Sequence, residues 1–452
     1  MARRLKIKLI EPSRYRGGTL QRVQRLLFPP LTLPLVAALT PDDFDVTIHN
    51  DSFEPVDYDE QVDLVGLTAY TAQALRAYEI ADEYRRRGVH VAMGGIHASM
   101  LPDEAAEHAD TVFVGEAEQT WPQFLADFTD GRAEARYQPE TLPDLSGLPL
   151  PKFSLMDSSR YVCCRTDGLN RLLPTPMLPV QTARGCPHGC EFCSVTALNG
   201  RKFRTRPIDD VIREIRSGGA RSYMFLDDNI FAIPRRAKDL FEALIPLKIS
   251  WHGQGTVDAA KDPELLQLAR RSGLTVLFIG LESLSAGALK AMGKTQNVVA
   301  DYGKHLQAFR KAGVSVMASM IFGFGPEEPD VFDKTCDFLM ANRVSYAAWW
   351  PLTPFPGTGL FDRLKKEGRL KQDAWWLDPS AGSELVDFKF TGLDMGEETF
   401  RTRFHRAYRR FYSLRGIFRR VLLPPQKRCF QKTVMNLMFR KRVSPKRAIL
   451  ES

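Results

Sequence analysis

The 452-residue sequence predicts an α/β protein built from two successive parallel-sheet units. Strand-like and helix-like segments alternate through residues 1–140 and again through residues 179–371, and this alternation is typical of parallel strands joined by helical crossovers. Frequent prolines interrupt the rhythm between the two units, so residues 141–178 are expected to form a linker. Residues 372–452 lack the rhythm and are expected to form a basic, mainly helical segment.

The first unit is predicted to be a doubly wound domain of Rossmann type, because unbroken apolar runs such as residues 64–67 fit strands buried on both faces. The predicted strands are Leu5–Ile10, Phe44–Ile48, Leu64–Tyr70, Val89–Met93 and Thr111–Val114. The helix-like segments between them include Leu31–Leu39, Ala72–Arg87 and Glu118–Asp127. The N-terminus alternates charged and apolar residues, which predicts a first strand instead of a signal peptide and therefore an intracellular, cytoplasmic protein.

The second unit is predicted to be a full or partial (β/α)6 barrel. Its expected strands are Val180–Ala183, Ser222–Leu226, Ile249–Gly253, Thr275–Ile279, Ser315–Ile321 and Ala347–Pro351. Its helix-like segments include Asp209–Arg216, Ala237–Ile245, Pro263–Arg271 and Val298–Ala312. In such barrels the chemistry belongs at the carboxyl ends of the strands. Neighbouring residues of a strand face opposite sides, so at most one of Trp349 and Trp350 points into the barrel.

Basic residues gather at the two ends of the chain. Residues 401–452 hold 16 Lys and Arg against one acid, and residues 1–27 hold eight against one, although the whole chain has 62 basic and 54 acidic residues. Aromatic residues recur at helical spacing along 400–412, and an interfacial helix needs this combination. We therefore predict peripheral docking of residues 400–452 on the inner membrane face. The alternatives are a helix packed on the barrel by its aromatic face and, less favoured, an RNA-binding tail.

A cysteine cluster follows the first barrel strand directly. Its members, Cys186, Cys190 and Cys193, can converge from one tight loop. Thiolates suit zinc or iron–sulfur clusters, and three ligands on a cubane would leave one iron open for a substrate. The alternatives are a zinc site completed by His188 and cysteines that merely pack in a core. Cys163 and Cys164 fall in the linker, and Cys336 fits a helical core pattern.

This loop, with Phe192 just before the third cysteine, resembles that of the radical S-adenosylmethionine (SAM) superfamily. The resemblance implies a 4Fe–4S cluster on the three cysteines, an open iron that chelates SAM, and Phe192 against the adenine. The segment 225–229 would bring Asp227 and Asp228 to the amino group of SAM. The segment 320–325 would lie near the adenine. As an alternative, the two aspartates could cap the helix that begins near residue 234.

The segment Gly280-Leu281-Glu282-Ser283 also matches this superfamily in order and place. The resemblance implies that Glu282, with Ser283 beside it, faces the ribose hydroxyls of SAM. A surface carboxylate with no such role is the alternative for Glu282.

The first unit resembles the cobalamin-binding domain that accompanies many radical SAM enzymes, through segments 94–99 and 114–121. The resemblance implies cobalamin contacts from Thr68, Tyr70, Gly94, Gly95, His97, Gly115 and Glu116. Glycines just past buried strands let the backbone approach a large cofactor. The Asp-x-His-x-x-Gly signature of an axial histidine is absent, so the axial ligand stays unassigned. A domain that only shapes the substrate cavity is the alternative.

Taken together, the resemblance implies a cobalamin-dependent radical SAM enzyme whose cofactors carry the hard chemistry. A 5′-deoxyadenosyl radical would take hydrogen from an unactivated carbon, and methylcobalamin would deliver a methyl group. The expected substrate is a hydrophobic small molecule of lipid, terpenoid or tetrapyrrole type, and the expected electron donor is flavodoxin- or ferredoxin-like. Cyclisation, hydroxylation or rearrangement are the alternative outcomes. An RNA-modifying relative is disfavoured, because residues 1–150 contain no cysteine, and the cysteine loop disfavours a non-catalytic cobalamin sensor.

Overall fold

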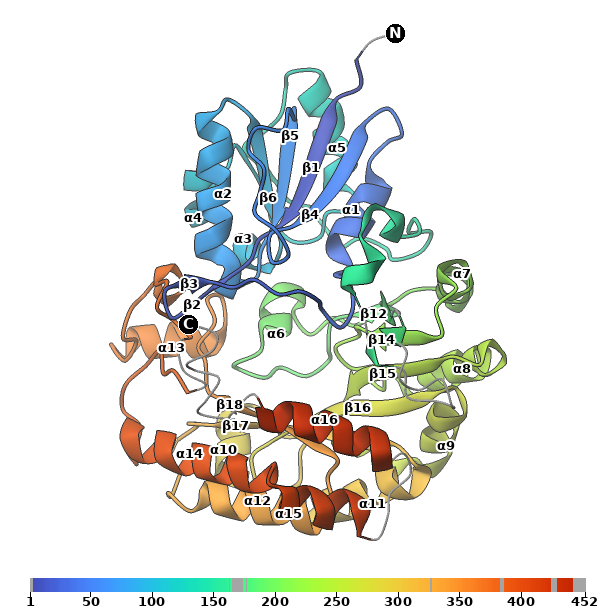
Figure 1. Ribbon diagram of the computed structural model, residues 1–452, viewed down its shortest axis with the longest axis vertical. Coiled ribbons are helices and arrows are strands. Elements are labelled where there is room, and N and C mark those ends of the chain that lie inside the picture. The colour runs from blue at the N-terminus through green and yellow to red at the C-terminus, as the bar shows by residue number, and fades with distance from the viewer. Residues whose placement is uncertain are drawn as a thin grey trace.

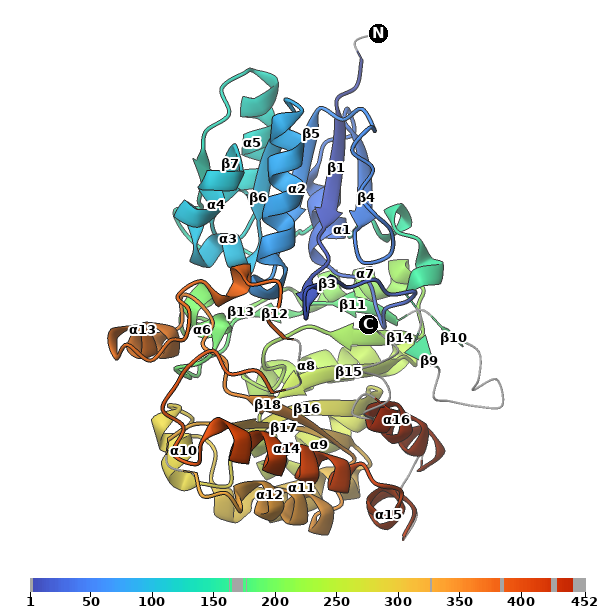
Figure 2. The ribbon, with the colours of Figure 1, turned by 60° about the vertical axis from the view of Figure 1, so that its left-hand side comes forward.

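Two parallel β-sheets, one from each half of the chain, lie one above the other in the computed structural model (Figure 1). The structure describes residues 3–161, 163–164, 174–175, 177–325, 327–382, 386–423 and 429–441. The carboxyl ends of the upper strands point toward the lower domain, and the second view shows the same stacking (Figure 2). The α/β architecture predicted from the sequence is confirmed.

The upper sheet has six parallel strands. In sheet order they are β4 (Asp45–Asn50), β1 (Lys6–Glu11), β5 (Leu64–Thr68), β6 (His90–Gly94), β7 (Thr111–Phe113) and β8 (Arg136–Tyr137). The five predicted strands are present with ends within two residues of the prediction. The sequence did not indicate β8, because two residues are too short to show a period.

Helices cover both faces of the upper sheet, which makes it doubly wound. The helices are α1 (Thr32–Leu39), α2 (Ala74–Arg86), α3 (Ile96–Met100), α4 (Pro102–His108) and α5 (Thr120–Thr129). Side chains of α2, α3 and α4 share one core with Val65 and Leu67, whereas those of α1 and α5 share another with Leu64. Neighbouring strand residues thus serve opposite faces, as an alternating strand geometry requires.

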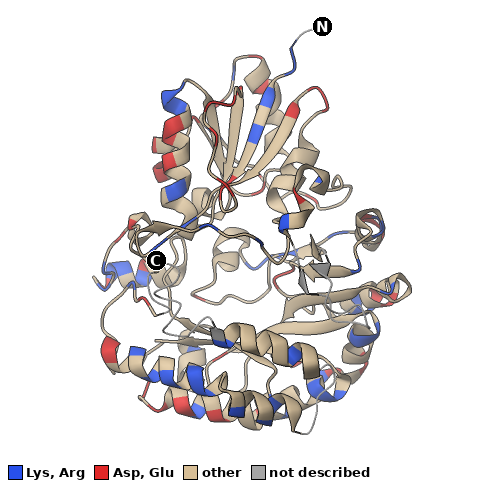
Figure 3. Cartoon of the chain, viewed as in Figure 1, with Lys and Arg blue, Asp and Glu red and all other residues tan. Residues whose placement is uncertain are grey.

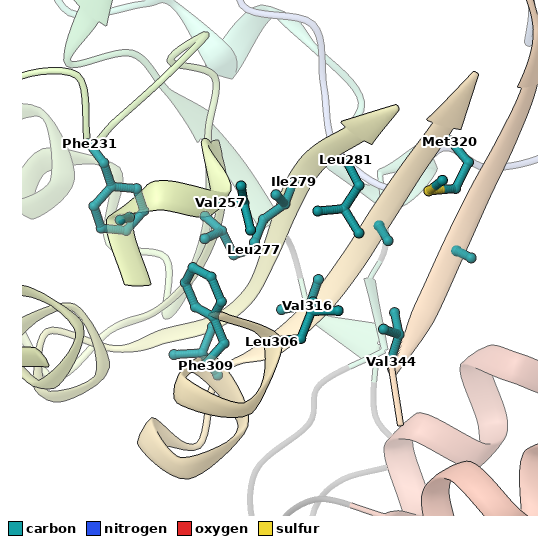
Figure 4. Packing of buried hydrophobic residues seen from close by; sticks show 14 of the residues in the cluster. Phe231, Val257, Leu277, Ile279, Leu281, Leu306, Phe309, Val316, Met320 and Val344 are labelled. Carbon is teal, nitrogen blue, oxygen red and sulfur yellow. The ribbon is translucent and has the colours of Figure 1, made fainter. Parts of the chain in front are cut away.

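The lower sheet also has six parallel strands. In sheet order they are β11 (Met177–Val180), β14 (Ser222–Phe225), β15 (Ser250–Gly255), β16 (Leu274–Glu282), β17 (Ser315–Phe322) and β18 (Tyr346–Pro351). Among the described residues β11 and β18 do not pair, so the barrel is partial. The main helices after the strands are α7 (Ile208–Gly218), α8 (Pro234–Leu244), α9 (Pro263–Arg271), α10 (Ala286–Ala291), α11 (Tyr302–Ala312) and α12 (Val331–Ala341). Apolar side chains such as Leu306 and Phe309 fill the space between helix and sheet (Figure 4).

The first barrel strand is displaced from its predicted position at Val180–Ala183. It ends at Val180, because the next ladder donor, the N–H of Thr182, is taken by the Asp227 carboxylate at 3.1 Å. The chain then forms a separate antiparallel pair, β12 (Ala183–Arg184) with β13 (Arg204–Thr205). The prediction therefore merged two strands. The side-chain hydrogen bond that separates them leaves no trace in the hydrophobic pattern of the sequence.

The predicted linker contacts both domains. The N–H of Lys152 donates to the Pro34 carbonyl of α1 at 2.9 Å, and the N–H of Gly147 donates to Asp210 of α7 at 2.8 Å. Cys163 and Cys164 form β9, which pairs with β10 (Pro174–Thr175), but their side chains lie outside the described residues. These contacts fit a segment that wraps from one domain to the other.

The C-terminal segment is helical, with α14 (Glu397–Phe411), α15 (Leu414–Ile417), the π-helix η8 (Phe418–Leu422) and α16 (Cys429–Lys441). Its aromatic face is buried, and the members of that face, Phe400, Phe404, Tyr408, Phe411 and Tyr412, expose no more than 7% of their surface. They pack on α12 and on the outer side of β18, for example Phe400 on Phe332 at 4.8 Å between ring centroids. The prediction that residues 400–412 present this face to a membrane is therefore wrong, and the barrel-packing alternative is correct.

Basic residues are frequent along the C-terminal helices (Figure 3), and several of them are paired or buried. Arg406 and Arg410 of α14 form ion pairs with Asp333 and Asp337 of α12. Arg420 is fully buried and donates to the carbonyls of Val344 (2.8 Å) and Phe411 (2.9 Å), among others. Burial lowers the pKa of Arg420 to about 10. Within the described parts of the chain, no helix combines the length and apolar character needed to cross a membrane.

Candidate cofactor site at the domain junction

The loop after β12 carries the three candidate ligands Cys186, Cys190 and Cys193 as free thiols. Gly185 starts the loop at φ +87°, and a Cβ there would lie 2.0 Å from the Lys202 carbonyl oxygen, so no other residue fits. Glu191 anchors the middle of the loop, since its N–H donates to the Met292 carbonyl at 3.0 Å and its carboxylate pairs with Arg363 of α13 (Gly359–Lys366) at 2.7 Å. The backbone of the loop is thus held from several sides.

The three thiols of this loop are of the ligand type that binds an iron–sulfur cluster. Burial raises the pKa of Cys186 and of Cys190, and the charge of the Cys193 thiolate raises both further. In the described residues no three His, Cys, Asp or Glu side chains are gathered tightly enough to hold a metal ion, with His188 or without it. The three thiols would therefore turn toward one another on binding a cluster.

Asp227 and Asp228 lie in the loop directly after β14 and support the cysteine loop. Asp227 is fully buried and accepts the hydroxyl of Thr182 at 2.8 Å, and burial raises its pKa to about 7. Asp228 accepts the N–H of Gly185 at 2.9 Å, which fixes the start of the loop. The helix-capping alternative is wrong, because α8 begins after Ile233 with no side-chain cap. Their contact with the amino group of SAM stays a prediction.

Glu282 is not a surface carboxylate, since it is 5% exposed at the end of β16. Its φ of +63° is in the left-handed region, which a non-glycine residue occupies at a cost of about 1–3 kcal/mol and often at functional sites. One oxygen pairs with Lys294, whereas the buried Oε2 has no hydrogen-bond partner among the described residues. The side chain of Glu282 can therefore accept a hydrogen bond from a ligand. Ser283 beside it uses its hydroxyl to accept the Ser285 N–H at 3.1 Å.

Lys294 is a site residue that the sequence did not reveal. It is almost fully buried between Glu282 and the cysteine loop, and its charge lowers the pKa of the Cys190 thiol against the dominant effect of burial. It follows α10 in a loop with no motif, so only the fold brings it to the thiols. Its ammonium group provides positive charge beside the candidate cluster.

The structure brings Phe192 against the segment that was predicted to lie near adenine. The Phe192 ring meets the Phe324 ring edge-on at 5.7 Å between centroids. Glu327, also missed by the sequence analysis, accepts the N–H of Gly323 at 2.7 Å, and burial raises its pKa to about 7. These contacts join the end of β17 to the cysteine loop.

The candidate cobalamin contacts lie along the carboxyl edge of the upper sheet, after β5, β6 and β7. Gly95 has φ +93°, and a Cβ there would lie 2.6 Å from the Thr68 hydroxyl and 2.9 Å from the Ala69 nitrogen. Gly94 lies beside Phe113, and the N–H of Gly115 donates to Ser99 Oγ at 2.9 Å. These close approaches and the hydrogen bond pack the loops side by side. Tyr70, which is 66% exposed, follows β5 at the same edge.

His97 lies inside the upper domain. It is fully buried, and its Nε2 is 2.9 Å from the Tyr78 hydroxyl and 3.2 Å from a Glu104 oxygen. The same Glu104 oxygen accepts the Trp376 Nε1–H at 2.9 Å, which links this network to η7 (Trp375–Leu377). Hydrogen bonds from these three partners outweigh burial and hold the pKa of Glu104 below its usual value. The Nε2 atom of His97 is thus engaged by the protein, whereas its buried Nδ1 atom has no hydrogen-bond partner among the described residues.

Glu116 is also engaged, at the junction of the two domains. Its carboxylate accepts Arg184 Nη1 at 2.8 Å and Arg204 Nη1 at 3.0 Å, both from the hairpin that precedes and follows the cysteine loop. Neither arginine was singled out in the sequence, because ion pairs between distant segments leave no local pattern. The loop after β7 is therefore joined directly to the cysteine loop.

Of the tryptophan pair at β18, only one side chain is available to the barrel interior. Trp349 stacks on Phe322 at 5.2 Å on the outer face, which α14 covers. Trp350 lies on the opposite face of the strand and is 51% exposed. It offers a large apolar surface near the carboxyl end of the strand.

Comparisons with known proteins agree with this arrangement. A family model described as Radical SAM superfamily matches residues 180–339, and one described as B12 binding domain matches residues 25–125. Bacteriochlorophyllide d C-12(1)-methyltransferase of Chlorobaculum tepidum is 30% identical, over 87% of this chain and 84% of that protein. Hopanoid C-2 methylase of Rhodopseudomonas palustris is 27% identical, over 76% of this chain and 66% of that protein.

Solved structures share the fold. The radical SAM methyltransferase TsrM from Kitasatospora setae, with cobalamin and a [4Fe-4S] cluster bound, has a TM-score of 0.63 at 17% identity and covers 80% of this chain and 75% of its own. The cobalamin-dependent radical SAM enzyme OxsB has a TM-score of 0.58 at 15% identity, covering 92% and 67%.

A cysteine loop on a partial barrel, joined to a doubly wound domain, defines a radical SAM enzyme with a second cofactor-binding domain. This chain belongs to the radical SAM superfamily, in the group that carries a B12-binding domain ahead of the radical SAM domain. Membership in this group implies three cofactors, namely a 4Fe–4S cluster, SAM and cobalamin.

Proposed function

We propose that the protein is a cobalamin-dependent radical SAM C-methyltransferase that acts on an unactivated carbon of a hydrophobic small molecule. One observation carries the proposal: the cysteine loop and the glycine-lined edge of the B12-binding domain meet at a single junction through Arg184 and Glu116. When bound, the cofactors supply an electron and a 5′-deoxyadenosyl radical on one side and a methyl donor on the other. The chain holds the two sources of chemistry face to face.

The roles of the protein side chains follow from their contacts. Cys186, Cys190 and Cys193 are the ligands we assign to the cluster, while Asp227 and Asp228 hold the backbone on either side of Gly185. Glu282, with its unpaired oxygen, is suited to accept ribose hydroxyls, and Lys294 compensates its charge. Phe192 and Phe324 offer apolar ring faces to an adenine.

An apolar, flat substrate fits the exposed aromatic residues near the strand ends. Trp350, Tyr70 and Phe355 expose 51%, 66% and 36% of their surfaces, so their rings are available to an apolar ligand. Relatives named as methyltransferases of bacteriochlorophyllide and as a hopanoid methylase support a tetrapyrrole or polycyclic terpenoid. A tetrapyrrole is the better match, because the relative of highest identity among these carries that name.

The test is transfer of a labelled methyl group. Protein purified without oxygen, loaded with iron, sulfide and cobalamin, would be given SAM with a trideuterated methyl group, a reductant and a panel of tetrapyrroles and hopanoids. The expected result is a tetrapyrrole heavier by a labelled methyl group, with 5′-deoxyadenosine formed alongside, and no label transfer by protein prepared without cobalamin. Label transfer that proceeds equally without cobalamin would contradict the proposal.

A non-methylating reaction is the second candidate. Two relatives named anaerobic magnesium-protoporphyrin IX monomethyl ester cyclase, each 25% identical, match 68% and 67% of this chain and 54% and 58% of their own length. In the same experiment a cyclase would form 5′-deoxyadenosine and an altered tetrapyrrole that carries no deuterium. The mass of the product thus separates the two candidates.

We also propose two partners, a flavodoxin- or ferredoxin-like electron donor and the inner face of the membrane. The membrane contact would involve α15, η8 and α16 instead of α14. Large apolar side chains are exposed there, namely Leu414, Phe418, Leu423, Phe430, Leu437 and Met438. Exposed basic residues such as Arg415, Arg419 and Arg440 accompany them, which suits an anionic lipid surface.

Co-sedimentation with vesicles tests the membrane contact. Vesicles with about one third anionic lipid should bind the protein at low salt and release it at high salt, because the basic residues act through screened charge. Replacement of Phe418 and Phe430 by Ser should weaken binding, whereas Arg403→Ser on the packed helix α14 is the matched control. Equal binding to neutral vesicles, or none at low salt, would contradict the contact.

A further inference from the structure

Four charged side chains cross the junction between the domains. Glu116 and Glu118 come from the loop after β7, and Arg184 and Arg204 come from the β12–β13 hairpin. Besides the two bonds to Glu116, Arg184 Nη2 reaches Glu118 Oε1 at 2.5 Å. All four side chains are largely buried, with exposures between 8% and 18%. These four residues are called the clamp below.

The upper half of the clamp belongs to the candidate cobalamin edge. Glu116 directly follows Gly115, whose N–H is bonded to Ser99 of α3. The hydrogen bond joins the loop after β7 to the loop after β6, and α3 itself packs against α6 (Ser194–Asn199) of the lower domain. Glu116 is therefore tied, through Gly115 and Ser99, to the loops that line this edge.

The lower half of the clamp brackets the cysteine loop. Arg184 lies two residues before Cys186, and its Nε donates to Gln181 Oε1 at 2.7 Å. Arg204 reaches Asn199 at 3.4 Å, at the end of the helix that follows Cys193. The clamp thus holds the loop from both of its ends.

The clamp is electrically balanced and geometrically stiff. Two carboxylates face two guanidinium groups, and the planar guanidinium fork holds carboxylates in fixed directions. Burial alone would lower the pKa of Arg184, but the two carboxylates keep it above its ordinary value. Loss of the Glu116 carboxylate would leave the guanidinium group of Arg204 without its ion-pair partner and would weaken the junction, whereas loss of Glu118 would leave Arg184 with Glu116 alone.

We propose that the clamp is a positioning device that sets the distance and angle between the B12-binding domain and the cysteine loop, so that the methyl group of SAM can pass to cobalamin. The inference rests on the proposed function and adds to it the residues that align the two halves. Alignment matters at this scale, because a misplacement of about 1 Å can cost about 100-fold in rate. Glu116 then acts through geometry and not as a ligand of the cofactor.

The first readout needs no cofactor. Hydrogen–deuterium exchange of the cofactor-free protein would be compared for the unaltered chain, Glu116→Gln, Glu118→Gln and the control Glu83→Gln, which removes a carboxylate from an ion pair within α2. The two clamp variants should exchange faster at residues 114–121 and 181–206, and the control should not. Unchanged exchange in both clamp variants would overturn the inference.

The second readout separates two uses of SAM by the holoenzyme. With titanium(III) citrate as reductant and cobalamin and cluster loaded, reductive cleavage yields 5′-deoxyadenosine. Methyl transfer yields S-adenosylhomocysteine, because the sulfur–methyl bond breaks, sulfur keeps its electron pair, and the electron pair of reduced cobalt binds the methyl group. The clamp variants should form S-adenosylhomocysteine about 10- to 100-fold more slowly. Their rate of 5′-deoxyadenosine formation and their iron and cobalamin contents should stay within about twofold of those of the unaltered protein.

The outcomes are distinguishable. A proportional loss of both products would indicate a merely structural role, and a loss of cobalamin content with unchanged exchange would make Glu116 a cofactor contact; either overturns the inference. Glu116→Asp keeps the charge but shortens the side chain, so it should fold and give an intermediate product ratio even where Glu116→Gln does not fold. If the unaltered protein binds no cobalamin and forms neither product, the proposed function itself fails, and the inference fails with it.

Discussion

The carboxyl edges of the two sheets face the same junction but are built differently. Apart from the clamp carboxylates, which are already paired with arginines, the upper edge presents Gly95 and Gly115 at positive φ on loops tied by their own hydrogen bonds. The lower edge holds buried titratable groups, among them Asp227, Glu282 and Lys294. This difference indicates that each edge is suited to a different kind of cofactor. A bulky corrin needs close approach to backbone, whereas a small zwitterion with a sulfonium charge needs compensating groups.

The largest difference between the two edges is expected when the thiols of the lower edge are removed. Simultaneous replacement of Cys186, Cys190 and Cys193 by Ala should abolish 4Fe–4S loading and all reductive cleavage of SAM, since no other ligand of the described loop can take their place. Cobalamin binding should stay near one per chain, because the residues we propose as cobalamin contacts lie on the upper edge and do not include these cysteines. Iron analysis, optical spectra and 5′-deoxyadenosine assays check both halves. Reductive SAM cleavage by the triple variant would show that the cluster lies elsewhere.

The reciprocal change alters the upper edge alone. Gly95→Ala adds a Cβ 2.6–3.0 Å from Thr68 and Ala69 in a backbone conformation that only glycine adopts readily, at a cost of about 1–3 kcal/mol in the free energy of unfolding. The loop should shift, and cobalamin binding should fall at least tenfold while cluster content and SAM cleavage persist. Gly88→Ala, also at positive φ but with open space around it, is the matched control. Equal cobalamin loss in both variants would point to general destabilisation.

A smaller effect is expected from the charge pair of the lower edge. Lys294→Met should raise the KM for SAM about 10- to 100-fold, the usual range for a lost hydrogen bond to a charged group. It should also lower the free energy of unfolding, because Glu282 would remain buried without its cation. The double variant Lys294→Met with Glu282→Gln should regain stability but not affinity for SAM. Recovery of both would reduce the pair to a structural role.

Most of the fold, and the part of the site that is formed by residues close together in the sequence, could be predicted from the sequence. Strand and helix periods located both sheets, and one short motif located the three thiols. Lys294, Arg184 and Arg204 could not be predicted, because each acts through a partner that is distant along the chain and that only the fold brings near. The amphipathic helix α14 was placed at a membrane for a related reason, since a stripe of aromatic residues does not tell whether lipid or another helix will cover it.

The smallest predicted effect is a pH dependence that belongs to the lower edge. The pKa of Asp227 is raised from its usual 3.8 to about 7 by burial, so the folded protein holds a proton there that the unfolded chain releases. Between pH 4 and pH 7 the native state therefore binds more protons than the unfolded state, and the contribution of Asp227 to stability falls as the pH rises, by at most about 1.4 kcal/mol per pH unit. Asp227→Asn, which cannot ionise but can still accept the Thr182 hydrogen bonds, should flatten this slope in denaturant titrations of the cofactor-free protein. A slope that is unchanged in Asp227→Asn would assign it to another buried acid such as Glu327, whose pKa is raised to a similar value, and Glu327→Gln then serves as the comparison.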